Sequence, residues 1–222
     1  MSAVQSLVEE VQREGFGFFP SFVHGSLEER WAALSLLAQE FGTLVKGRNG
    51  QLVEILEPKS IKEAQRNSLS EQYGKGRFPF HIDMAHRQVP ARILLFACVG
   101  GGPKATPTFL VDARQLPFNE HEREVLKTGV FLIRNSRSSF YANIDQSDGS
   151  FLRWDPGCMY AQDQRARDAT KAMFFRVEHA VRHTIKWSDG AVLVVDNWRM
   201  LHARGCVADD NDKRVLLRVS VK

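Results

Sequence analysis

The segment Phe80-His81-Ile82-Asp83-Met84-Ala85-His86 is the stretch from which the rest of the chain can be interpreted. In an extended chain the side chains alternate between two faces, so His81 and Asp83 point in the same direction and can both reach one ion. Ile82 points the opposite way, into the body of the protein. A His-x-Asp pair is common by chance and usually lies on a strand edge or a loop, so it predicts a metal site only with a further ligand.

A second segment, Asp196-Asn197-Trp198-Arg199-Met200-Leu201-His202, supplies that ligand from far along the chain. Two imidazoles and one carboxylate form a facial triad that holds iron and leaves three of its positions open. His81, Asp83 and His202 are therefore predicted to bind one iron ion. For His202 alone, a core histidine bonded to a backbone carbonyl is the competing interpretation.

Length and composition favour one globular domain. The 222 residues suffice for a buried core, and no Pro-, Gly- or Ser-rich linker divides residues 1–222 into two units. No apolar run approaches the roughly 20 residues that a membrane span needs. The segment Met1–Arg13 lacks the apolar core of a signal peptide, and the few, widely spaced cysteines suit reduced thiols. A cytoplasmic protein is expected.

The charge pattern bears on the binding partners. The formal net charge is only +4, and the arginines are scattered without a basic tract. This pattern is not typical of a nucleic-acid-binding surface, and a site for a small anion explains the arginines more simply. We expect a small-molecule substrate, with neither nucleic acid nor membrane as a partner.

Hydrophobic periodicity predicts helices near the N-terminus and again later in the chain, with many short β segments between and after them. Helices are expected at Val4–Arg13, from Ser26 towards Phe41, at Phe118–Lys127 and at Gln162–Val177. Strands are expected at Gln51–Leu56, Arg92–Val99, Thr106–Asp112, Val130–Arg134, Ser150–Trp154, His183–Trp187, Gly190–Asp196 and Arg214–Val221. The stretch Lys59–Gly76 is expected to be a loop, and Gly100-Gly101-Gly102-Pro103 is expected to join its flanking strands as a hairpin.

These elements predict an α+β, mainly β fold: a double-stranded β-helix (jelly roll) flanked by helices. A doubly wound α/β fold fits less well, because strands and helices do not alternate regularly. The sequence contains no Gly-x-Gly-x-x-Gly or Walker motif that would bind a nucleotide.

Four segments, in this order, resemble the taurine dioxygenase / clavaminate synthase superfamily of iron(II)- and 2-oxoglutarate-dependent oxygenases. They are Phe80–Asp83, Thr106–Asp112, Asp196–Arg204 and Arg214–Arg218, and they span residues 80–218. The resemblance implies that Fe(II) is the metal bound by the triad and that 2-oxoglutarate and molecular oxygen are cosubstrates.

The same resemblance implies roles for three residues that would bind anions. Arg214 corresponds to the arginine that grips the distal carboxylate of 2-oxoglutarate, a task that suits the planar fork of a guanidinium, and Thr108 corresponds to the threonine that touches the same carboxylate. Arg218 lies four residues further on the same strand face, where it would meet the proximal carboxylate of the cosubstrate or an anionic group of the substrate. A solvated strand face is the alternative for Arg218.

Other residues receive weaker interpretations. Arg153, in Arg153-Trp154-Asp155, occupies a position where family members often have a strand residue that faces the pocket, so it is a candidate substrate contact. A structural arginine–aspartate pair is the alternative. Surface or structural roles are predicted for His86, His121, His179 and His183.

The leading hypothesis is an oxygenase that hydroxylates a small polar metabolite, amino-acid-like or anionic, and releases succinate and CO2. Desaturation, cyclisation or cleavage stay open as outcomes of the oxidation. A non-catalytic jelly-roll sensor that binds a metal or 2-oxoglutarate without turnover is the alternative. Zinc-dependent hydrolysis is disfavoured, because no second carboxylate is evidently placed near His81 as a general base, and Arg214 and Thr108 would have no role.

Overall fold

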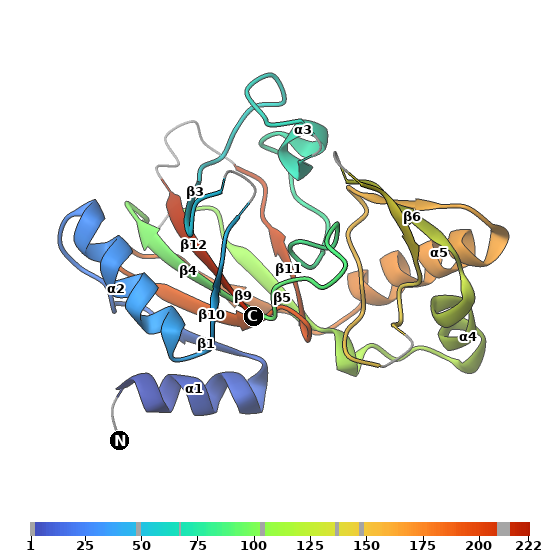
Figure 1. Ribbon diagram of the computed structural model, residues 1–222, viewed down its shortest axis with the longest axis horizontal. Helices are drawn as coiled ribbons and strands as arrows, with labels where there is room; N and C mark the ends of the chain where they lie inside the picture. The colour runs from blue at the N-terminus through green and yellow to red at the C-terminus, as the bar shows by residue number, and fades with distance from the viewer. Residues whose placement is uncertain are drawn as a thin grey trace.

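The computed structural model describes residues 3–47, 50–66, 68–102, 105–135, 138–146, 149–207 and 214–222. Within these ranges the protein is mainly β, with antiparallel sheets and flanking helices, as the sequence predicted (Figure 1). The helices are α1 (Ala3–Glu14), α2 (Leu27–Gln39), α3 (Leu69–Tyr73), α4 (Glu120–Thr128) and α5 (Gln164–Glu178). The strands are β1 (Phe16–Phe19), β2 (Leu44–Val45), β3 (Val53–Leu56), β4 (Ile93–Val99), β5 (Thr108–Asp112), β6 (Phe131–Ile133), β7 (Phe140–Ala142), β8 (Met159–Ala161), β9 (His183–Ile185), β10 (Val192–Asp196), β11 (Met200–Arg204) and β12 (Val215–Val221).

The predicted helices form where their local signals place them. Ser26 caps α2: its side chain accepts a hydrogen bond from the backbone N–H of Glu29, and the Glu29 carboxylate accepts one from the backbone N–H of Ser26. This reciprocal capping box confirms the predicted start of the helix. None of the helices among the described residues is long and apolar enough to cross a membrane.

The largest sheet has six strands in the order β1-β10-β4-β12-β2, with β3 also paired to β12. In its central strand β4, six successive side chains are buried. Because successive side chains of a strand point to opposite faces, β4 is buried on both faces of the sheet. Leu95 packs towards α1 and α2, whereas Leu94 and Phe96 pack towards the three-stranded sheet β11-β5-β9. The interior between these two sheets is where the polar site residues lie.

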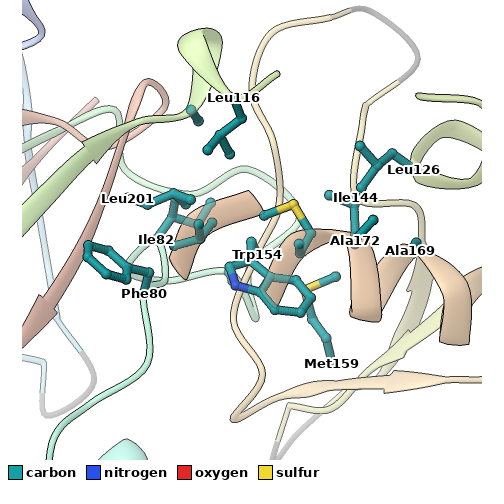
Figure 2. Packing of buried hydrophobic residues seen from close by; sticks show 14 of the residues in the cluster. Phe80, Ile82, Leu116, Leu126, Ile144, Trp154, Met159, Ala169, Ala172 and Leu201 are labelled. Carbon is teal, nitrogen blue, oxygen red and sulfur yellow. The ribbon is translucent and has the colours of Figure 1, made fainter. Parts of the chain in front are cut away.

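A third sheet, β7-β6-β8, packs with α4 and α5 on the other side of the molecule (Figure 1). Its core is joined to the metal segment through Trp154. In Figure 2, Trp154 lies between Ile82 on one side and Ala172 of α5 on the other. The side chain of Ile82 is 1% exposed, so it points into the protein body as alternation predicted.

Two strand predictions were wrong. The segments β4 and β5 do not form a hairpin: β4 pairs with β10 and β12, whereas β5 pairs with β11 and β9 in another sheet. The chain crosses between sheets after Gly100–Gly102, and Pro103 lies outside the described residues. The segment 150–154 is not a strand, because its only ladder contact is an isolated bridge from Leu152 to Asp145.

The sequence also left several elements unassigned. Strands β1, β2, β7, β8 and β11 are short or irregular in pattern, and α3 interrupts the predicted loop Lys59–Gly76. Strand β11 matters most, because it carries His202.

Candidate metal centre

The three predicted ligands lie close together between the six-stranded sheet and the sheet β11-β5-β9. The ligand atoms of His81, Asp83 and His202 all lie within 4.8 Å of one another. Oδ1 of Asp83 is 3.5 Å from Nε2 of His81 and 3.7 Å from Nε2 of His202. Both histidines are only 7% exposed and Asp83 is half-buried, so this cluster is not a grouping of exposed surface residues.

Backbone pairing places the ligands. His81 forms a β-bridge with His202: each backbone N–H donates to the other residue's carbonyl, at 3.0 and 2.9 Å. The bridge brings the early metal segment alongside β11, and His202 projects from β11 into the space between the sheets. The long sequence separation of the two histidines is thus closed by one antiparallel contact.

The hydrogen bond of His81 fixes which nitrogen can bind a metal. Its Nδ1 lies 2.9 Å from the carbonyl oxygen of Pro79, which can only accept. In the neutral ring Nδ1 therefore carries the proton, and the lone pair is on Nε2, the atom that faces Asp83. Two imidazole nitrogens and a carboxylate oxygen fit Fe(II).

The two oxygens of Asp83 face different partners. Oδ1 faces the imidazoles, while Oδ2 accepts a hydrogen bond from Nη1 of Arg218. Nη2 of Arg218 also donates to Oε2 of Glu54 at 2.6 Å. Arg218 and Glu54 lie directly opposite each other on the paired strands β12 and β3. One guanidinium thus joins the predicted ligand Asp83 to Glu54, which also lines the cavity described below.

This network keeps the ligand carboxylate charged. Burial opposes ionisation of Asp83, but Arg218 and the two imidazoles outweigh it and hold its pKa well below the usual value. Burial together with neighbouring His81 lowers the pKa of His202. Burial also disfavours a charged His81, but Asp83 and Asp155 outweigh burial and raise its pKa.

The predicted cosubstrate residues lie beside the triad. Arg214 is 6% exposed, and its Nη1 is 3.5 Å from the hydroxyl oxygen of Thr108 on β5. The indole N–H of Trp187 donates to the same oxygen at 3.0 Å. Because that oxygen already accepts from Trp187, the Thr108 hydroxyl can donate its own proton to an anion that Arg214 binds.

A cavity of about 560 Å³ connects these groups. It is lined by the triad and by Thr108, Arg214 and Arg218, so the structure brings together six of the seven predicted site residues. Residues 53–59 and 68–70 line it as well, together with Gln51 and Gln65. Its size suits a small molecule.

Arg153 is the predicted site residue that the structure does not bring into the cavity. Its side chain is 1% exposed, and its guanidinium donates to the carbonyls of Ala85, Arg87 and Gln88 behind the metal segment. Its position therefore does not favour a substrate contact. Among the described residues, no carboxylate pairs with it, so the alternative arginine–aspartate pair is not formed either.

Four residues of the site were missed or given no role. Glu54 and Asp155 line the cavity, and so does His86, which was predicted to be surface or structural. Asn197, 0% exposed, holds the Asp83 backbone: its Oδ1 accepts from the Asp83 N–H at 2.8 Å, and its Nδ2 donates to the Asp83 carbonyl at 3.0 Å. The sequence signal that could have identified Asn197 is its position as a polar residue directly after the buried strand β10.

Solved structures share this fold. An asparagine oxygenase with Fe(II), 3-hydroxyasparagine and succinate has 18% identity and a TM-score of 0.78, and the match covers 98% of this chain and 78% of that one. The non-heme iron oxygenase OrfP with Fe and alpha-ketoglutaric acid has 20% identity and a TM-score of 0.75, over 100% and 80% of the two chains. The PvcB protein from Pseudomonas aeruginosa has 17% identity and a TM-score of 0.72, over 98% and 79%.

Two buried histidines and a half-buried carboxylate, beside a cavity that Arg214 and Arg218 line, match the ligand set of non-haem iron enzymes. The model of the taurine catabolism dioxygenase TauD, TfdA family matches residues 107–220, slightly more than half of the chain. The chain belongs to this family, which confirms the family and the dioxygenase class predicted from the sequence. A comparison with curated protein sequences finds no significant match.

Proposed function

We propose that the protein is an Fe(II)- and 2-oxoglutarate-dependent oxygenase that hydroxylates a small amino-acid-like metabolite and releases succinate and CO2. The observation that carries this proposal is that one cavity is lined by both the triad and the pair Arg214 and Thr108. The solved asparagine oxygenase and OrfP, which have this fold, contain iron together with succinate or alpha-ketoglutaric acid.

The residues of the cavity divide the task. His81, Asp83 and His202 would hold Fe(II) through two imidazole nitrogens and one carboxylate oxygen. Bound Fe(II) supplies the redox chemistry that couples decarboxylation of 2-oxoglutarate to oxidation of a C–H bond. Arg214 and Thr108 bind the distal carboxylate of 2-oxoglutarate and so orient its 2-oxo acid end towards the triad.

Charge balance near the triad favours a zwitterionic substrate. With 2-oxoglutarate bound, the cosubstrate carries two negative charges, and Asp83 and Glu54 carry one each. Fe(II) carries two positive charges, and Arg214 and Arg218 carry one each, so these groups are neutral together. Arg218 and Glu54 lie side by side on the cavity wall and are joined by a 2.6 Å hydrogen bond. A guanidinium next to a carboxylate complements the carboxylate and ammonium groups of one amino acid.

Asp155 bears on the side chain of the substrate. Asp155 lines the cavity, and its carboxylate accepts hydrogen bonds from the Gly157 N–H at 2.8 Å and from the Cys158 thiol at 3.5 Å but forms no salt bridge among the described residues. An unmatched carboxylate in a partly buried cavity favours a ligand with a hydrogen-bond donor. We therefore favour an amino acid with an amide or a cationic side chain.

The proposal also includes the fold, the cellular location and the binding partners of the protein. The six-stranded sheet and the sheet β11-β5-β9 are the two faces of a double-stranded β-helix, in a single domain over residues 1–222. The protein acts in the cytoplasm on small molecules and does not bind nucleic acid.

The test is substrate-stimulated succinate release. The purified protein is incubated with Fe(II), 2-oxoglutarate and oxygen, together with each proteinogenic amino acid in turn. Succinate and oxygenated amino acid are then quantified, with His202→Ala as the inactive control. At least one amino acid should stimulate succinate release and gain one oxygen atom per succinate formed. Binding of iron and 2-oxoglutarate without stimulation by any amino acid or small acid would instead identify a sensor.

A further inference from the structure

The segment from Met84 to Ala91 directly follows the proposed metal ligand Asp83 and begins with an unusual backbone conformation. Met84 has φ +60°, a left-handed conformation that non-glycine residues rarely adopt. A hydrogen bond from the Arg87 N–H to the Met84 carbonyl, at 2.8 Å, closes a turn after it. Strained backbone of this kind persists only where the surroundings hold it in place.

Arg153 supplies much of that hold. Its Nη1 donates to the carbonyls of Ala85 and Arg87, the latter at 2.7 Å, and its Nη2 donates to the carbonyl of Gln88 at 2.8 Å. Its guanidinium also lies 5.2 Å from the centres of two aromatic rings, those of Phe140 and Phe151.

Burial of this cation is unfavourable unless the carbonyls stay in place. Burial lowers the pKa of Arg153 to about 10, so the side chain is still charged at neutral pH. Within the described residues no carboxylate neutralises it, and three backbone dipoles provide the compensation. Any movement of the turn would separate a buried charge from its acceptors, so the contact resists such movement.

The chain around Arg153 holds the metal segment on both sides of Asp83. Before Asp83, the Ile82 N–H donates to the carbonyl of Trp154 at 2.8 Å, and the two side chains pack together (Figure 2). After Asp83, the guanidinium of Arg153 binds residues 85–88. We propose that Arg153 is a positioning residue that keeps the Asp83 carboxylate aimed at the metal. The inference rests on the proposed function, because it assumes that Asp83 is an Fe(II) ligand.

The experiment compares three variants by metal binding and by stability. Arg153→Met keeps an unbranched side chain but removes all three bonds, and Arg153→Lys keeps the charge but loses the fork. The control is Arg30→Met, because Arg30 also donates to two carbonyls, those of Gly25 and Cys98, and to the carboxylate of Asp189, but none of these partners belongs to the metal segment. Fe(II) affinity is measured anaerobically by calorimetry on the metal-free proteins, thermal unfolding is measured separately, and the absorption of the Co(II)-loaded proteins reports ligand geometry.

Arg153→Met should weaken Fe(II) binding about 10- to 100-fold and change the Co(II) spectrum, as expected for residues that orient metal ligands. Arg153→Lys should weaken it less, and Arg30→Met should lower thermal stability without changing Fe(II) affinity. If Arg153→Met does not fold, Arg153→Lys decides the question.

Parent-like Fe(II) affinity in the folded Arg153 variants would overturn the role of Arg153, and so would an equal loss in Arg30→Met. A parent protein that binds no Fe(II) would overturn the proposed function itself. The two failures are therefore distinguishable.

Discussion

Replacing Asn197 by alanine should destabilise the protein far more than removal of a half-buried side-chain amide that makes a single hydrogen bond. Asn197 is 0% exposed, and its side chain satisfies three backbone groups: the N–H and the carbonyl of Asp83 and the carbonyl of Ala91. In Asn197→Ala all three lose their partner in a place that water reaches poorly.

The magnitude follows from these three groups. A buried polar group without a partner costs about 1–3 kcal/mol. Some relaxation towards the cavity offsets part of the sum, so we expect a loss of roughly 3–5 kcal/mol in the free energy of unfolding. This is a large share of the roughly 5–15 kcal/mol that stabilises a typical protein.

The assay is urea unfolding of the metal-free protein, followed by circular dichroism. Asn143→Ala is the matched control, because half-buried Asn143 donates a single bond to the Gly129 carbonyl at 3.0 Å, and its loss should cost about 1 kcal/mol. The reasoning fails if Asn197→Ala is no less stable than Asn143→Ala.

Three further predictions concern the cavity. Replacing any one triad residue by alanine should abolish tight Fe(II) binding in a folded protein, and parent-like iron content in all three variants would place the site elsewhere. Arg214→Lys should weaken 2-oxoglutarate binding by about 1.5–3 kcal/mol in anaerobic calorimetry, because the guanidinium fork is lost, and Thr108→Val should weaken it less. An unchanged dissociation constant in Arg214→Ala would remove that assignment. Arg218→Ala and Glu54→Gln should each raise the Michaelis constant for the amino-acid substrate more than the constant for the cosubstrate, and the reverse order would assign Arg218 to the cosubstrate.

The placement of His81 beside Asp83 could be predicted because its signal is local. Alternation places His81 and Asp83 on one face, and the bulky Ile82 between them anchors the segment in the core. The class of fold was also within reach, since short β segments dominate the chain after residue 80. Both depend on patterns that span only a few residues.

Strand pairing and side-chain direction could not be predicted. Glu54 and Arg218 are 164 positions apart, and only the pairing of β3 with β12 makes them neighbours. The prediction for Arg153 rested on a position where family members often have a strand residue that faces the pocket, but segment 150–154 has a single bridge and is not a strand. A glycine-rich turn has the same composition in a hairpin as in a crossing between sheets, and this is why the pairing of β4 with β5 was wrong.

The most direct test of the account is the linkage between Fe(II) and 2-oxoglutarate. In the proposed site, Fe(II) held by the triad contacts one end of 2-oxoglutarate while Arg214 binds the other end. Fe(II) must then strengthen the binding of 2-oxoglutarate, and 2-oxoglutarate must strengthen the binding of Fe(II) by the same factor. Anaerobic calorimetry should give one Fe(II) per chain and a 2-oxoglutarate affinity at least about tenfold higher with Fe(II) than without it. Equal 2-oxoglutarate affinity in the presence and absence of the metal would contradict a shared site.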